Sequence, residues 1–280
     1  MEEWFRDTGG EGFANAYRID EVLFDGRSCY QHVQVVRNAF FGRMLLLDEA
    51  VQTTEADEFI YHEMLAHLPL VTHPAPTSLL IIGGGDGGLL EEALKHPLRQ
   101  AVMVEIDEMV VEVIRRYIPE IPRGAFEDPR VELRFEDGSA YVRRTERRFD
   151  VALVDSTDPQ GPSVSLFSAE FYGDLHRLLT EEGVVAVQSG SPLYQRDLIV
   201  QVRRNLKQHF PIVRTFLVPI PTYPGAFWSF TLGSKGPDPL AISPGVIEDR
   251  IAGMNLQYYT AARHHESLMT PPFLREVLEA

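Results

Sequence analysis

The chain has 280 residues, of which 44% are hydrophobic and 24% charged, as expected of a globular protein with a sizeable core. Its formal net charge of −15 argues against a nucleic-acid partner and suits cationic small molecules. The single cysteine, Cys29, excludes an internal disulfide and a cysteine-based metal cluster. The sequence opens without a signal-peptide pattern and has no apolar run long enough to cross a membrane, so we expect a cytoplasmic protein with no membrane partner.

The first 55 residues or so have the pattern of short β-strands separated by glycine-containing turns. Candidate strands cover residues 17–24, 29–36 and 43–47. A helix is predicted from about residue 55 to 68, followed by Pro69 and a proline-containing linker. We therefore predict a small N-terminal β-rich domain with its linking helix over residues 1–68.

Residues 69–280 alternate between strand and helix patterns. Strands are predicted at 79–82, 101–105, 131–135, 151–155, 183–188 and 212–218, and helices at 89–95, 108–117, 168–179 and 197–209. This alternation predicts an α/β fold with a Rossmann-like, doubly wound and mainly parallel sheet. A last strand at 228–234 follows too closely for a crossover helix, so it should pair antiparallel with strand 212–218.

The first of these strands runs directly into a glycine-rich loop, Gly83-Gly-Gly-Asp-Gly-Gly88. Glycines such as Gly83 and Gly85 allow a ligand to approach the backbone at the N-terminus of the following helix. Glu105 ends the next strand, 22 residues after Gly83, where a carboxylate can bind ribose hydroxyls. Together these features indicate an adenosine-type ligand.

Asp86, inside the glycine loop, has two interpretations. Aspartate is a favoured helix N-cap, so its role can be structural. Alternatively, its carboxylate lies at the place where a ligand's phosphate or carboxylate would normally bind. There it would repel those groups and attract a cation. The second interpretation favours a positively charged ligand over a dinucleotide.

Further acidic residues follow the other predicted strands. Asp137-Gly138 could accept a hydrogen bond from an exocyclic amine such as N6 of adenine, or could form a plain turn. Asp155 and Asp158 close the fourth strand of this sheet, either as a pair of functional carboxylates or as a capped turn before Pro159. Because ligands bind at the carboxyl ends of such strands, these acids predict a negatively lined cleft.

Other candidate chemistries fit less well. His62 and His67 are five residues apart, which places them on different helix faces and excludes the zinc-protease motif. No Gly-x-Ser-x-Gly elbow follows a strand, which argues against a serine hydrolase. Tyr61 and Tyr223 are either core aromatics or cleft residues, and the proline-bounded turn around Tyr223 favours the cleft.

Several of these motifs, in this order, resemble the polyamine aminopropyltransferases, most closely the spermidine synthases. The resemblance covers nearly the whole chain and is carried by residues 57–64 (DEFIYHEM), the glycine loop, Glu105-Ile-Asp107, Asp137-Gly138, Asp155-Ser-Thr-Asp-Pro159 and Pro221-Thr-Tyr-Pro224. It implies a small β-domain preceding a methyltransferase-like Rossmann domain. It also implies transfer of an aminopropyl group from decarboxylated S-adenosylmethionine to an amine such as putrescine, without a metal or other cofactor, by a homodimer or homotetramer.

The resemblance also implies roles for individual residues. Asp155 would be the base, assisted by Tyr61, and Asp86 would join Asp155 at the aminopropyl group. The remaining donor ligands would be Gln31, His62, Gly83, Gly85, Glu105, Asp137 and Gly138, and the amine pocket would be lined by Tyr61, Asp158, Gln188 and Tyr223. The chemistry agrees, because two cationic substrates need a carboxylate-lined site and the attacking amine must lose a proton.

Two departures from the family pattern leave alternatives open. Leu47-Asp48-Glu49 replaces the usual Leu-Asp-Gly, and Pro192-Leu193-Tyr194 lacks a tryptophan near the amine pocket. The acceptor could therefore be agmatine, cadaverine or spermidine in place of putrescine. Less favoured alternatives are a small-molecule methyltransferase that uses intact S-adenosylmethionine and a non-catalytic polyamine-binding protein.

Overall fold

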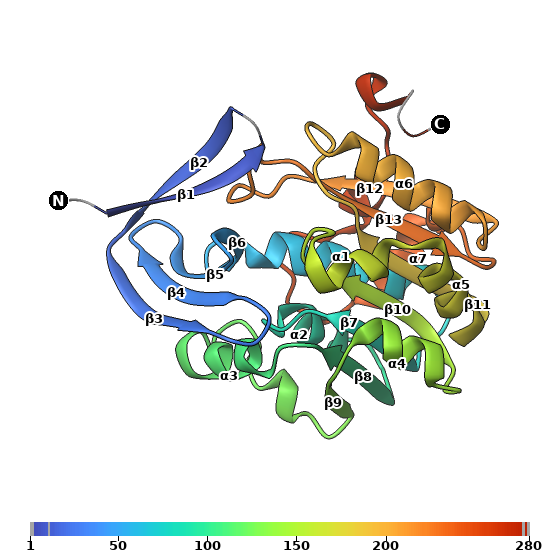
Figure 1. Cartoon of the computed structure of the whole chain (residues 1–280). Coiled ribbons are helices and arrows are strands. Elements are labelled where there is room, and N and C mark those ends of the chain that lie inside the picture. The colour runs from blue at the N-terminus through green and yellow to red at the C-terminus, as the bar shows by residue number, and fades with distance from the viewer. Residues whose placement is uncertain (1–2, 11, 276–277, 279–280) are drawn as a thin grey trace.

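The N-terminal part of the chain forms two small antiparallel sheets beside a larger sheet in the computed structural model (Figure 1). The structure describes residues 3–10, 12–275 and 278; the rest of the predicted domains, 1–68 and 69–280, lies outside the described residues. The first small sheet is a hairpin of β1 (Glu3–Gly10) and β2 (Phe13–Ile19). The second contains, in chain order, β3 (Glu21–Arg27), β4 (His32–Asn38), β5 (Gly42–Leu47) and β6 (Ala50–Thr54).

These small sheets correct part of the strand prediction. The strand predicted over residues 17–24 is two strands, because the chain bends at Asp20, whose N–H donates to the Arg37 carbonyl (2.8 Å). The bend lets β2 pair with β1 while β3 pairs with β4. The strand predicted from residue 29 begins at His32, since Ser28 and Gln31 close a turn ahead of it. Strands β1 and β6 were not predicted.

The large sheet confirms the α/β prediction. Its strand order is β12-β13-β11-β10-β7-β8-β9, with parallel pairing from β11 through β9. The last strand, β13, pairs antiparallel with both β12 and β11. The strands are β7 (Ser78–Gly83), β8 (Gln100–Glu105), β9 (Val131–Phe135), β10 (Phe149–Asp155), β11 (Leu179–Gln188), β12 (Ile212–Val218) and β13 (Trp228–Ser234). Strand order reverses between β7 and β10, which is where such sheets bind ligands.

Helices cover both faces of this sheet, and each face has its own apolar core. Leu79 and Ile81 of β7 pack into one cluster, whereas Leu80 and Ile82 pack into the other, as the two-residue period of a strand requires. The helices are α1 (Glu58–Thr72), α2 (Gly88–Leu94), α3 (Glu108–Tyr117), α4 (Gly138–Arg144), α5 (Ala169–Leu178), α6 (Arg196–Lys207), α7 (Pro244–Ile251) and α8 (Ala261–Ser267). Among the described residues, no helix is both long and apolar enough to span a bilayer.

Helix α1 extends further than predicted. It was expected to end before Pro69, but it runs to Thr72 with Pro69 inside it. Proline removes one hydrogen bond from a helix, yet Leu68, Leu70 and Val71 are fully buried and hold the last turn in place. The helix contacts α2, β10 and β11. The division of the chain after residue 68 stays a prediction.

Candidate active site

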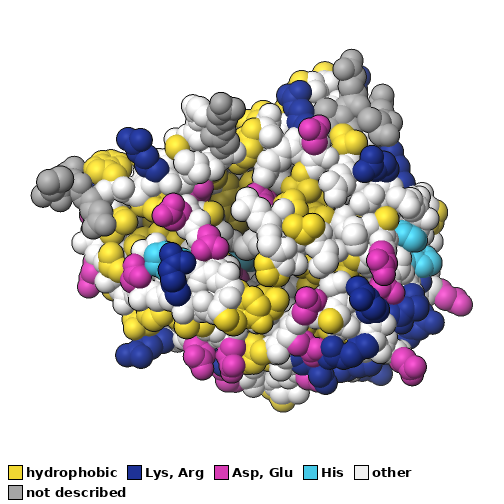
Figure 2. Space-filling view, in the orientation of Figure 1, with side chains coloured by type: hydrophobic (Ala, Val, Ile, Leu, Met, Phe, Trp, Pro, Cys, Tyr) yellow, Lys and Arg dark blue, Asp and Glu magenta, His cyan; other side chains and the backbone are white. Residues whose placement is uncertain are grey.

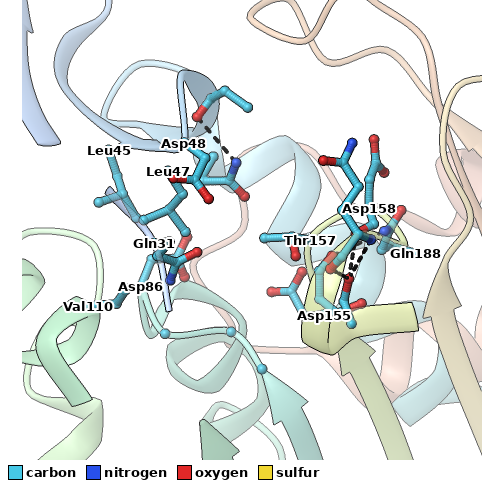
Figure 3. Close-up of a pocket in the computed structure, with 18 of the residues that line it drawn as sticks. Gln31, Leu45, Leu47, Asp48, Asp86, Val110, Asp155, Thr157, Asp158 and Gln188 are labelled. Atoms are coloured by element: carbon cyan, nitrogen blue, oxygen red, sulfur yellow. Dashed lines mark hydrogen bonds between the residues drawn. The ribbon is translucent and has the colours of Figure 1, made fainter. Parts of the chain in front are cut away.

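A cavity of about 640 Å³ lies at the carboxyl ends of β7, β8 and β10, where the N-terminal sheets meet the large sheet. Figure 2 shows the hollow near the centre of this face, with acidic side chains around it. Every residue that the sequence singled out for the site lines the cavity: Gln31, Tyr61, His62, Gly83, Gly85, Asp86, Glu105, Asp137, Gly138, Asp155, Asp158, Gln188 and Tyr223. In Figure 3, Gln31 and Asp86 lie on one side, and Asp155, Asp158 and Gln188 lie on the other. The roles of these residues in binding stay predictions.

The glycine loop is shaped by two close approaches. Gly83 has φ +83°, and a Cβ there would lie 2.0 Å from the carbonyl oxygen of Asp155. Glycine therefore lets the end of β7 contact the end of β10, and the Gly84 N–H donates to the same carbonyl (2.9 Å). A Cβ at Gly85 would lie 3.1 Å from the Glu105 carboxylate. The loop thus brings the ends of three strands together.

Glu105 is buried at the end of β8, with 7% of its surface exposed. Burial raises the pKa of its carboxyl group to about 7, although Glu105 accepts the N–H of Asp107 (2.9 Å). Asp107 in turn caps α3 by accepting the Met109 N–H (3.1 Å). It also accepts hydrogen bonds from the side chains of Ser28 (2.6 Å) and Gln31 (2.9 Å). The sequence analysis did not predict these hydrogen bonds of Asp107, although an aspartate directly before a predicted helix was a local sign of the helix cap.

Asp137 is the N-cap of α4, a helix that was not predicted. Its Oδ1 accepts the Ala140 N–H (2.9 Å), so the interpretation as a plain turn gives way to a helix cap at the mouth of the cavity. The next residue, Gly138, has no room for a side chain, because a Cβ there would lie 2.4 Å from the Ile82 side chain. Adenine recognition by Asp137 stays a prediction.

Asp86 and His62 form a buried group with Glu58. Asp86 accepts the Gly88 N–H (3.0 Å) through Oδ1, while the N-cap residue of α2 is Gly87. His62 Nε2 lies 3.3 Å from Asp86 Oδ2, and His62 Nδ1 lies 2.7 Å from Glu58 Oε2. Burial disfavours a charged His62, but the two carboxylates outweigh it and raise the pKa of His62 well above its usual range. The i, i+4 spacing of Glu58 and His62 was a signal that the sequence prediction did not use.

At the centre of the cavity, the Tyr61 hydroxyl donates to Asp155 Oδ1 (2.6 Å). Burial, followed by repulsion from Asp86, raises the pKa of Asp155 to about 6. The Tyr61 ring packs edge-on against Phe230 and Tyr223, with centroid distances of 4.8 Å and 5.9 Å. Asp155 is therefore ionised at neutral pH and held by a neutral hydroxyl.

Beyond Asp155 a second carboxylate, that of Asp158, lines the cavity. Asp158 accepts the Gln195 amide (2.6 Å) through Oδ2, while its buried Oδ1 has no partner among the described residues. Burial raises the pKa of Asp158. The amide of Gln188 is already bonded to Ser156 (3.1 Å) and Gly190 (3.1 Å), so its polar groups hold the neighbouring loops.

The N-terminal sheets supply part of the cavity wall. Asp7 of β1 is 5% exposed and accepts the Val51 N–H (3.0 Å). Burial raises the pKa of Asp7 to about 6, and the charge of Asp158 adds to the effect. The Tyr223 hydroxyl donates to the Gln52 carbonyl of β6 (2.7 Å), so it is directed at the small sheet. The sequence did not single out Asp7, because its place depends on a side-chain hydrogen bond between strands of two different small sheets.

The two departures from the family pattern have structural explanations. Asp48 and Glu49 form the two-residue β5–β6 turn with φ angles of 44° and 65°, a conformation that favours glycine. Leu193 is 47% exposed and does not line the cavity, so the change at this position does not alter the wall of the amine pocket. Tyr194 supplies an aromatic ring to the wall, and its hydroxyl donates to the Pro224 carbonyl (2.7 Å).

Comparisons with known proteins agree with this geometry. Residues 58–240 match the family model described as the spermine/spermidine synthase domain, and residues 3–55 match the spermidine synthase tetramerisation domain. The chain is 47% identical over 278 residues to a polyamine aminopropyltransferase of Moorella thermoacetica, covering 99% of this chain and 96% of that protein. It is 39% identical over 279 residues to the polyamine aminopropyltransferase of Bacillus subtilis, covering 99% of both.

Solved structures give the same result. A spermidine synthase in complex with the transition state analogue AdoDATO matches with a TM-score of 0.95 and 37% identity, over 99% of this chain and 95% of that one. The Thermotoga maritima spermidine synthase matches with a TM-score of 0.93 and 37% identity, over 99% and 94%. The chain therefore belongs to the spermine/spermidine synthase family of polyamine aminopropyltransferases.

Proposed function

We propose that this protein transfers the aminopropyl group of decarboxylated S-adenosylmethionine to putrescine, giving spermidine and methylthioadenosine. The observation that carries the proposal is the row of carboxylates Asp86, Asp155 and Asp158, which runs along one cavity from the glycine loop. Both substrates are cations, and a buried carboxylate row offsets their mutual repulsion. A phosphate-bearing ligand would be repelled at the same place.

The donor would bind at the β7–β8 side of the cavity. Glu105 would accept hydrogen bonds from the ribose hydroxyls, and Asp137 would face the adenine amine. Asp86 would pair with the terminal ammonium of the aminopropyl group. Intact S-adenosylmethionine carries an additional carboxylate on that group, so Asp86 supports selection of the decarboxylated donor.

The reaction is a displacement at the carbon next to the sulfonium sulfur. The amine nitrogen forms a C–N bond, the C–S bond breaks, and its electron pair stays on sulfur as the neutral thioether of methylthioadenosine. Asp155 would orient the amine and accept or relay its proton, with Tyr61 holding the carboxylate in place (2.6 Å). The sulfonium is already a good leaving group, so we propose that no metal or additional cofactor takes part.

The acceptor end supports a diamine. One ammonium group would meet Asp155 while the methylenes lie along Tyr61 and Tyr223, and the second ammonium would meet the carboxylate of Asp158. A chain of the wrong length leaves that second charge unpaired in a buried place, which is costly. We therefore favour putrescine over agmatine, cadaverine and spermidine.

Product analysis by mass spectrometry tests this function directly. The protein is incubated with decarboxylated S-adenosylmethionine and each of the four amines, and kcat/KM is measured for those that react. We expect spermidine and methylthioadenosine from putrescine, with the highest kcat/KM and no loss of rate in a chelator. A higher kcat/KM for another amine would replace the acceptor, and a methylated product would overturn aminopropyl transfer.

We also propose that the protein assembles as a homotetramer, in preference to a dimer. The residues that match the tetramerisation domain carry large exposed hydrophobic side chains outside the cavity: Trp4, Phe13, Val22 and Phe40. Contact with a partner subunit would remove such side chains from water. Light scattering coupled to size-exclusion chromatography measures the assembly, and a monomer at micromolar concentration would contradict it.

A further inference from the structure

His62 is a buried titratable group in a cavity that we propose to bind cations. It is 1% exposed, and each of its ring nitrogens faces a carboxylate: Glu58 at 2.7 Å and Asp86 at 3.3 Å. A neutral imidazole has a single N–H, so one of these two approaches would bring two acceptors together. The 2.7 Å contact is a hydrogen bond and the 3.3 Å contact is a charge contact, and carboxylates at these distances favour a ring with both nitrogens protonated, an imidazolium.

The groups around His62 come from several elements. Glu58 and Tyr61 share helix α1 with it, Asp86 belongs to the glycine loop, Asp155 ends β10, and Tyr223 follows β12. Burial keeps the two tyrosines neutral by raising the pKa of each hydroxyl. The anions facing His62 are therefore Glu58, Asp86 and Asp155, and these carboxylates stabilise its charge while the cavity holds no ligand.

A Cβ at Gly88 would lie 2.2 Å from His62 Nδ1, so the glycine at the start of α2 is what allows the ring to lie between its two carboxylates. The ring has little freedom to turn away, because it is enclosed by α1 and the loop. A second cation arriving at Asp86 would thus meet His62 at short range in a buried setting, where like charges repel strongly.

We propose that protonated His62 neutralises Asp86 while the site is empty. When the terminal ammonium of the donor binds at Asp86, His62 loses one proton to solvent, so the donor's charge replaces that of the histidine. The proposal rests on the donor assigned under the proposed function. It makes Glu58 a positioning residue, because Glu58 holds the imidazolium without contacting the donor. It also means that Asp86 is neutralised in both states, by His62 in the empty site and by the donor ammonium in the occupied one.

Proton release is measured by titration calorimetry in two buffers of different ionisation enthalpy. Methylthioadenosine is the reference ligand, because it shares the adenine and ribose but lacks both the aminopropyl ammonium and the sulfonium charge. At about pH 8, Asp155 and most of Glu105 are already ionised, so neither contributes much. We expect binding of the decarboxylated donor to release about one proton more than binding of methylthioadenosine does. The ratio of the donor's Kd to that of methylthioadenosine should therefore fall by about tenfold for each unit that the pH rises.

Two substitutions locate the source of the proton. His62→Gln keeps a polar side chain without a titrating group, and it should abolish the difference between the two ligands. Glu58→Gln keeps the imidazole but removes one of its carboxylates, so the released fraction at about pH 8 should fall. The matched control is His67→Gln, which removes another buried histidine of α1 outside the cavity and should leave the release unchanged.

The outcomes separate this proposal from the proposed function. Donor binding and turnover without additional proton release would overturn the exchange and leave aminopropyl transfer intact. Equal release with both ligands, or undiminished release in the His62→Gln and Glu58→Gln variants, would also overturn it. Failure of the decarboxylated donor to bind or react would overturn both proposals.

Discussion

Two histidines of helix α1 have the same degree of burial and opposite pKa shifts. His62 lies between the carboxylates of Glu58 and Asp86, whose attraction outweighs the cost of burial and raises its pKa. His67 contacts His96 (2.9 Å) and Glu92 (2.9 Å), but the same Glu92 oxygen also accepts from Lys95 (2.7 Å). Burial, with a further contribution from Lys95, lowers the pKa of His67 to about 3.

The difference shows that burial alone does not decide the charge of a histidine; the uncompensated charge around it does. The open cluster, Glu58, His62, Asp86 and Asp155, has more carboxylates than cations and faces the cavity. In the closed cluster, His67, Glu92, Lys95 and His96, the Glu92 carboxylate is paired with Lys95 (2.7 Å), which also contacts Glu91 (3.3 Å), and the cluster lies outside the cavity. One helix therefore carries a site that attracts cations and a polar network that supports packing.

The largest expected effect comes from the open cluster. Asp155→Asn should lower kcat by about 10²–10⁴-fold, because a positioned base is lost, while methylthioadenosine still binds. In the unmodified protein kcat/KM, which reports ionisations of the free enzyme, should fall as the pH drops through about 6, where Asp155 becomes protonated. Steady-state kinetics and calorimetry measure both quantities. The His67→Gln variant is the control and should turn over normally; near-normal turnover of Asp155→Asn would shift the role of base to Asp158 or water.

A smaller effect is expected from Asp86→Asn, which removes one charge from the same cluster. The decarboxylated donor should bind roughly 10–100-fold more weakly, the usual worth of a hydrogen bond to a charged group. Intact S-adenosylmethionine should bind no more weakly, since its carboxylate no longer meets an anion. Competitive binding assays give the ratio of the two affinities. Equal affinity for both ligands in the unmodified protein would sink the role of Asp86 in donor selection.

The closed cluster should control stability in acid. His67 and His96 titrate near pH 3 when folded, because burial lowers both pKa values, and near 6.5 when unfolded. At these two histidines the unfolded chain then binds more protons, so their contribution to stability is fully present above about pH 6.5 and is lost as the pH falls toward 3. The loss is about 1.4 kcal/mol per pH unit for each histidine.

Urea denaturation between about pH 5 and 7 measures this slope. His67→Gln should reduce it by about one proton, whereas His62→Gln should not reduce it, because the folded state stabilises a charged His62. Equal slopes in the unmodified protein and the His67→Gln variant would show that the closed cluster does not bind protons on unfolding.

The sequence predicted the large sheet well because its information is local. Aliphatic runs end in glycines or acids, and Glu105 and Asp155 follow their strands directly. The small sheets were predicted poorly although β1–β2 and β5–β6 pair as sequence neighbours, because the β5–β6 turn lacks its usual glycine and the β1–β2 pairing is irregular between Asp7 and Gly10. Asp7 was missed because its hydrogen-bond partner Val51 is 44 residues away. Burial and charge around His62 depend on three elements that meet only in the folded chain.

The smallest expected effect concerns backbone strain in the β5–β6 turn at the edge of the open cluster. Glu49 lines the cavity at φ 65°, a conformation that costs a side-chain-bearing residue about 1–2 kcal/mol relative to glycine. Glu49→Gly should therefore raise the free energy of unfolding by about 1 kcal/mol, reduced in part by the greater freedom of glycine in the unfolded chain.

Glu49→Gln is the matched control for this turn, because it removes the charge and keeps the strain. Both variants should raise KM for the cationic substrates by a similar small factor, since a charge at the cavity mouth is screened by solvent. The gain in stability should be confined to Glu49→Gly, as measured by urea denaturation. If both variants gain equally, repulsion between Glu49 and the neighbouring carboxylates, and not the backbone angle, is what destabilises the turn.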